Sequence, residues 1–151
     1  MSIHDRLRAH GITLPAAAAP VASYQPVVVD GHTAYVSGQL PFIDGKLVTG
    51  KLGEDIALDR GIAAARACGL MILSQLEAAG LIERVAHMVK LGGFVASIPD
   101  FFDQPKVING ASDLMVEVFG DAGKHARSAV GVPVLPLNAA VEVDAIVALK
   151  A

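Results

Sequence analysis

The distribution of apolar and polar residues along the chain predicts an α+β fold. Residues 27–29 and 33–37 are two apolar-rich runs joined by an Asp-Gly turn, which is the pattern of a β-hairpin. Residues 56–79 carry few polar side chains and predict a long helix with a wide apolar face. Residues 84–98 are rich in β-branched and apolar side chains, so they predict a long strand with a bulge or a close backbone approach at its Gly-Gly pair.

The C-terminal part of the chain predicts one more helix and two more strands. The helix begins at Asp113 at the latest and ends before Gly120, and the strands cover residues 126–132 and 140–149. The order β-β-α-β-α-β-β favours a single sheet with two helices packed on one face.

The length of the chain predicts a single domain, residues 1–151, in which residues 1–20 form an N-terminal helix and linker extension. Hydrophobic residues make up 53% of the sequence, and the mean hydropathy is +0.51. A domain of this size has limited interior, so we expect interfaces between subunits to bury part of this apolar surface.

Charge, apolar runs and cysteine content indicate which partners and which cellular location we expect. Fifteen acidic residues against twelve Lys and Arg give a net charge of −3, and no basic run is present, so we expect no nucleic acid partner. Residues 10–29 are uncharged but interrupted by Gly and Pro, and no signal peptide is apparent, so we expect no membrane association. The single cysteine, Cys68, fits a reducing, cytoplasmic location and is interpreted as a buried small side chain.

A charged pair near the C-terminus is the candidate for chemistry. Arg127 opens an apolar run in which residues 128–141 carry no charge, and a guanidinium in such a place requires an anion. Glu142 begins the next predicted strand, and the connection is long enough to make the two strands neighbours. In one interpretation, which the spacing alone slightly favours, Arg127 and Glu142 form a buried ion pair with each other. In the alternative, Arg127 binds a ligand carboxylate while Glu142 handles a proton or a water.

Three segments resemble the RidA/YjgF family, also called endoribonuclease L-PSP. Residues 126–147, ARSAVGVPVLPLNAAVEVDAIV, are similar to its C-terminal signature of an Arg-Ser pair, a short apolar strand, Leu-Pro and a Glu-bearing strand. Residues 35–41, YVSGQLP, resemble its Ser-Gly-Gln segment. Residues 109–132 resemble the longer branch of the family, and the resemblance as a whole spans roughly residues 18–151.

The resemblance implies a fold like that of Bacillus-type chorismate mutase and a homotrimer with clefts between its subunits. In the deaminase branch of the family, the residue matching Arg127 binds the carboxylate of a 2-imino or 2-enamino acid, and the one matching Glu142 positions water. The other residues implied to line the cleft are Tyr24, Ser37, Gly38 and Asn109. Neither a metal nor an organic cofactor is implied, and the five histidines show no paired ligand spacing.

Several of these positions also have a purely structural interpretation. Asn109 alternatively caps the second helix, Tyr24 packs with its hydroxyl at the surface, and Ser37 serves a turn. Ala129 stands where many deaminase members carry Cys, which changes the volume of the substrate pocket. His125 stands where a Pro often occurs, and it either adds a titrating group near the cleft or is a solvated loop residue.

Three functions remain open from the sequence. The first is hydrolysis of reactive imines or enamines of amino acids. The second is non-catalytic binding of a small carboxylate metabolite, or of a partner protein, by a trimer that uses Arg127 in the same way. Ribonuclease activity is third, because charge and composition offer RNA no binding surface.

Overall fold

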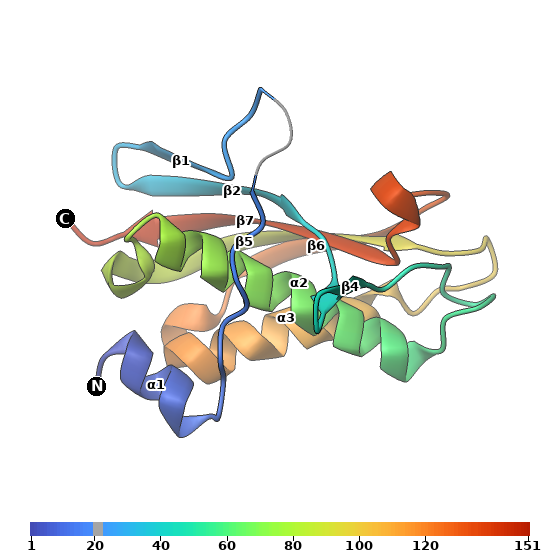
Figure 1. Ribbon diagram of the computed structural model, residues 1–151, viewed down its shortest axis with the longest axis horizontal. Coiled ribbons are helices and arrows are strands. Elements are labelled where there is room, and N and C mark those ends of the chain that lie inside the picture. The colour runs from blue at the N-terminus through green and yellow to red at the C-terminus, as the bar shows by residue number, and fades with distance from the viewer. Residues whose placement is uncertain (20–22) are drawn as a thin grey trace.

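A computed structural model describes residues 1–19 and 23–151 and shows the expected α+β architecture (Figure 1). The elements are α1 (Ile3–Ala9), β1 (Val27–Asp30), β2 (Thr33–Gln39), β3 (Phe42–Ile43), β4 (Lys46–Leu47), α2 (Leu58–Ala78), β5 (Val85–Ala96), α3 (Gln104–Phe119), β6 (Ala126–Val132) and β7 (Val141–Leu149). The five-stranded sheet has the order β1-β2-β7-β5-β6. Helices α2 and α3 lie side by side on one of its faces (Figure 1).

The local signals of the sequence predict several element ends correctly. Ser2 and Asp5 form a capping box at the start of α1, each side chain bonded to the other residue's backbone N–H. The first Asp-Gly pair turns β1 into β2, and the second, Asp44-Gly45, joins the short strands β3 and β4. Asp44 and Gly45 both have positive φ angles, the conformation that a tight hairpin turn requires.

The predicted adjacency of the last two strands is wrong, because β5 lies between them. β6 pairs in parallel with β5 at the sheet edge, whereas β7 pairs antiparallel with both β5 and β2. The physical reason is the α3 crossover, which brings β6 back parallel to β5. The connection to β7 includes a short 3-10 helix, Pro136–Asn138, and crosses to the other side of β5 instead of forming a hairpin.

The two glycines of β5 allow close approach and do not form a bulge. The pairing irregularities of β5 lie before Lys90, and Gly92 and Gly93 are in register with β6 and β7. A Cβ on Gly93 would lie only 2.6 Å from the Ile108 side chain of α3, and a Cβ on Gly92 would collide with the Asp144 carboxylate. The sheet and α3 therefore pack more closely here than any larger residue permits.

The N-terminal segment is attached along α2. The Ser74 hydroxyl donates to the Pro15 carbonyl at 2.7 Å, and the Gln75 amide donates to the Ala18 carbonyl at 2.8 Å. Figure 1 shows this segment crossing the helical layer after α1. None of the described helices combines the length and the apolar character that a bilayer span requires.

The contact between α2 and α3 depends on Gly110, because a Cβ there would collide with the Ile62 carbonyl oxygen. We expect Gly110→Ala to lower the free energy of unfolding by roughly 2–3 kcal/mol, measured by urea denaturation. Val116→Ala changes an exposed position on the same helix and should cost less than about 0.5 kcal/mol. A neutral Gly110→Ala would contradict this close helix contact.

Candidate active site

The first half of the candidate site is a cavity of about 410 Å³, here called the Glu142 pocket. It brings together three residues predicted from the sequence, namely Tyr24, Gly38 and Glu142. The remaining lining residues come from the N-terminal segment up to the start of β1, from β2, β3 and the link between them, from α2 and from the loop before β7: Ala18, Ala19, Pro26, Gln39, Leu40, Phe42, Met71, Gln75, Pro136 and Leu137.

A bulge in β2 makes room for the Glu142 carboxylate. The pairing of β2 with β7 shifts between Val36 and Gln39, so one extra residue is accommodated on β2. Gly38 lies in this bulge, and a Cβ there would come within 2.8 Å of the Glu142 carboxyl group. Gly38 therefore allows the carboxylate to lie directly against the backbone of β2.

A chain of side-chain amides holds the bulge, and it includes two residues that the sequence analysis did not select. The Gln75 amide nitrogen donates to the Ala18 carbonyl and, at 3.2 Å, to the Gln39 side-chain oxygen. The Gln39 amide nitrogen then donates to the Ser37 carbonyl at 2.9 Å. The Ser37 hydroxyl donates to the Gln25 carbonyl at 2.7 Å, so Ser37 anchors the preceding loop.

The pocket disfavours negative charge. Burial, and then the nearby Asp144 carboxylate, raise the pKa of Glu142 above its ordinary value. Burial also raises the pKa of Asp144, against the opposing effects of the Gly92 N–H and Lys90. A carboxylate with a raised pKa is suited to exchanging protons with a substrate or a water. Cys68 is fully buried, as expected, and burial raises the pKa of its thiol well above the usual value.

The second half of the site is a smaller cavity of about 280 Å³ around Arg127, here called the Arg127 cleft, lined by Ser112, Asp113, Val116, Lys124, His125 and Arg127. The guanidinium of Arg127 donates to Asn109 Oδ1 at 2.8 Å, to Ser112 Oγ at 3.1 Å and to the Pro105 carbonyl at 3.2 Å. All three acceptors belong to α3. Asn109 lies within this helix, whose N-cap is Asp103, so the interpretation of Asn109 as a helix cap is wrong.

His125 is connected to Arg127 through a shared hydroxyl. Its Nδ1 lies 2.6 Å from the Gly123 carbonyl oxygen, which can only accept, so Nδ1 carries a proton. Its Nε2 lies 2.9 Å from Ser112 Oγ, the same oxygen that accepts from Arg127. His125 is therefore a part of the Arg127 cleft and not a solvated loop residue.

The two halves face opposite sides of the sheet. Gly93 on β5 faces α3, and it pairs with Ala129 on β6 and Val143 on β7. Side chains alternate along a strand, so Arg127, two residues before Ala129, also faces the helices. Glu142, next to Val143, faces the other side.

An ion pair between Arg127 and Glu142 is therefore excluded within one chain. No carboxylate in residues 1–19 and 23–151 forms an ion pair with Arg127, so its remaining N–H donors are available to a ligand. Ala129 packs against the core beneath the sheet.

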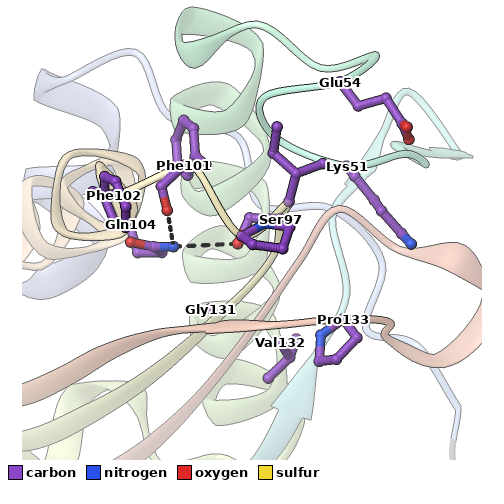
Figure 2. A pocket seen from close by; sticks show the side chains of 11 residues that line it. Lys51, Glu54, Ser97, Phe101, Phe102, Gln104, Gly131, Val132 and Pro133 are labelled. Atoms are coloured by element: carbon purple, nitrogen blue, oxygen red, sulfur yellow. Dashed lines mark hydrogen bonds between the residues drawn. The ribbon is translucent and has the colours of Figure 1, made fainter.

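A third cavity, of about 490 Å³, lies where β5 ends and α3 begins and holds none of the predicted residues. Figure 2 shows the Gln104 amide bridging the Phe101 carbonyl and the Ser97 hydroxyl, at 2.7 and 3.2 Å. A Cβ on Gly131 would lie 2.8 Å from both partners of the Gln104–Ser97 bond. The Gln104 amide thus holds the loop after β5 against the start of α3. Across the described residues, no three His, Cys, Asp or Glu side chains gather as a metal site.

Comparisons with known proteins agree with this fold. The family described as "YjgF/chorismate_mutase-like, putative endoribonuclease" matches residues 4–149. The chain is 54% identical to protein TCP17 of Trypanosoma cruzi, over 93% of this chain and 89% of that protein. It is 30% identical to the 2-iminobutanoate/2-iminopropanoate deaminase of Dermatophagoides farinae, over 92% and 95%. The crystal structure of Atu1372 from Agrobacterium tumefaciens, described as of unknown function, has a TM-score of 0.90 and 47% identity, covering 98% and 92%.

The raised pKa of Glu142 predicts how the stability of the protein depends on pH. The folded state disfavours the charged form of this carboxyl group. The contribution of protonated Glu142 to the free energy of unfolding is therefore present at acid pH and is lost as the pH rises through the raised pKa. We therefore expect Glu142→Gln to unfold at a higher urea concentration than wild type at neutral pH. Below the ordinary pKa of glutamate the two should unfold alike. Glu54→Gln, which removes an exposed carboxylate, should match wild type at both pH values, and the same result for Glu142→Gln would contradict the prediction.

Proposed function

The chain belongs to the YjgF/RidA family, and we propose that it hydrolyses 2-imino and 2-enamino acids to 2-oxo acids and ammonia. The observation that carries this proposal is that Arg127, held by three bonds to α3, has no carboxylate partner among the described residues. A guanidinium with free donors is suited to bidentate binding of a planar carboxylate. The relative named as a 2-iminobutanoate/2-iminopropanoate deaminase supports this substrate class.

Glu142 is the proposed proton acceptor and donor. A water attacks C2 of the protonated imine, forming a C–O bond as the C=N pair of electrons moves to nitrogen, and Glu142 takes a proton from this water. The resulting carbinolamine receives that proton on nitrogen, and the C–N bond breaks as the electrons of the hydroxyl oxygen form the ketone of the 2-oxo acid. Glu142 takes the hydroxyl proton in this step and passes it to the departing ammonia, which leaves as ammonium. The imine carbon is already electrophilic, so orientation of substrate and water supplies much of the rate.

We propose that the complete site forms between two copies of the chain in a homotrimer. Within one chain Arg127 and Glu142 lie on opposite faces of the sheet, so a substrate that contacts both must lie between neighbouring subunits. The face of the sheet without helices exposes large apolar side chains, including Val28, Tyr35 and Val130, whose burial would favour assembly. Small-molecule clefts between subunits are a common consequence of such symmetry.

A non-catalytic carboxylate-binding protein is the second candidate. It is favoured by the completeness of the Arg127 cleft, in which α3 orients the guanidinium without any contribution from Glu142. The two candidates differ in what Glu142→Gln should do, because binding tolerates the loss of this proton acceptor and hydrolysis does not.

The first test is a competition assay in which an amino-acid oxidase produces the imino acid and semicarbazide traps it. Wild type should reduce the trapped product. Glu142→Gln should lower kcat about 10²- to 10⁴-fold, and Arg127→Ala should lower kcat/KM by about 10²-fold because the substrate is no longer oriented. Arg60→Ala, at an exposed position on α2, should behave as wild type. A wild-type protein that never competes with the trap would leave carboxylate binding as the better proposal.

The second test asks whether one site uses two chains. Arg127→Ala and Glu142→Gln are each expected to be strongly impaired alone, as in the first test. When the two variants are co-expressed, mixed trimers contain interfaces with an intact arginine from one chain and an intact glutamate from the next. About a quarter of the wild-type activity per site should then return. No recovery in verified mixed trimers would show that both groups come from the same chain.

A further inference from the structure

Several polar groups of the Glu142 pocket are occupied by bonds within the protein. The Gln75 amide nitrogen and both ends of the Gln39 amide belong to the hydrogen-bond chain Ala18–Gln75–Gln39–Ser37. Gln75 is only 4% exposed, so it has little freedom to turn toward a ligand. Apart from Glu142, Tyr24 and the two glutamines, the side chains that line the pocket are apolar.

A leucine in an unusual backbone conformation forms part of the rim. Leu137 has φ 59° and ψ 20°, the left-handed region in which a branched side chain is strained. Its side chain is 73% exposed, so the chain gains little packing from having leucine at this position. A strained, exposed apolar residue at the edge of a cavity points to contact with a ligand.

The N-terminal segment forms another part of the wall. Ala18 and Ala19 line the pocket, and the Gln75 bond to the Ala18 carbonyl fixes the distance of this segment from α2. Because both side chains are single methyl groups, the pocket keeps a volume of about 410 Å³. That is more room than a one-carbon side chain fills.

From these observations we infer that the Glu142 pocket selects substrates whose side chain is apolar and longer than that of alanine, such as a branched four-carbon group. The inference rests on the proposed function for the imino acid headgroup. A polar side chain would exchange its hydrogen bonds to water for few new ones, because most of the lining side chains are apolar and the amide nitrogens of Gln39 and Gln75 already have partners. An acidic side chain would in addition lie beside Glu142, whose carboxyl group already experiences the negative charge of Asp144.

The experiment measures binding of stable 2-oxo acids to the full-length protein by titration calorimetry, so that it does not depend on turnover. The probes are pyruvate, 4-methyl-2-oxopentanoate and 2-oxoglutarate, which share the 2-oxo carboxylate and differ in side chain. The branched apolar acid should bind at least about tenfold more tightly than pyruvate, and 2-oxoglutarate should bind more weakly than the branched acid. Equal affinities, or tighter binding of pyruvate or 2-oxoglutarate, would overturn the inference.

Two pairs of variants test whether Leu137 and Ala19, two residues of the pocket wall, cause this preference. Leu137→Asn suits the left-handed backbone and should reduce the preference for the branched acid by roughly threefold or more while leaving pyruvate unaffected. Its control, Val134→Asn, changes a residue that is 68% exposed and lies outside the pocket lining. Ala19→Leu should likewise weaken only the branched acid, and Ala16→Leu, on the same segment but outside the lining of the Glu142 pocket, should not. An unchanged preference in both Leu137→Asn and Ala19→Leu would overturn the role of the wall.

Turnover of the corresponding imino acids distinguishes a failure of the proposed reaction from a failure of the proposed side-chain selectivity. Preference for the branched acid in binding, without hydrolysis of any imino acid, would reject the proposed reaction and support the selectivity of the pocket. Hydrolysis of alanine-derived and leucine-derived imino acids with equal kcat/KM would support the reaction and overturn the selectivity.

Discussion

Alternation of side chains along a strand governs how this protein can carry out chemistry. Arg127 and Glu142 belong to strands that flank β5 on either side, and their positions in the pairing register turn them to opposite faces of the sheet. Neither a rotamer change nor a small backbone shift can bring them together in one chain. In the proposed reaction a lone subunit therefore holds both chemical groups and cannot use them on the same substrate, which makes activity dependent on assembly.

Each half of the site is held rigidly by its own chain. Three acceptors on α3 fix the guanidinium of Arg127, and Ser112 extends this support to His125. On the other side, the Gln39–Gln75 bond joins the β2 bulge to α2 and keeps space for the Glu142 carboxylate. In the proposed trimer, assembly would have to align two prepared surfaces, so little conformational entropy would be lost when the substrate binds.

Local patterns in the sequence predicted the features that depend on neighbouring residues. The Asp-Gly turns, the apolar run of α2 and the cap of α1 all follow from short-range signals, and the family resemblance pointed to Arg127 and Glu142. The strand order was not predictable in this way, because pairing with β5 is decided by the α3 crossover and by long-range packing at Gly93. The length and charge of the C-terminal segments fit a hairpin equally well.

The supporting residues of the site were harder to find for a different reason. From the sequence, Gln75 resembles a polar residue on the exposed face of a helix. In the structure it is buried by the N-terminal segment, which lies about sixty residues away in the chain. Gln39 was visible only as a member of the Ser-Gly-Gln segment. Ser112 and His125 gain their role when α3 packs beside β6, a contact that no local pattern encodes.

The charges of the two halves fit the proposed imino acid substrate better than RNA. A protonated imine of an amino acid carries a negative carboxylate at one end and a positive C=N group at the other. In the proposed reaction Arg127 complements the first, and Glu142 with Asp144 complements the second. The positive group of the substrate would then offset the burial and the Asp144 charge that raise the pKa of Glu142. Its arrival thereby favours the ionised carboxylate that must accept a proton from water. A phosphodiester has no positive end, so RNA at Glu142 would add a further negative charge where two carboxylates already repel each other.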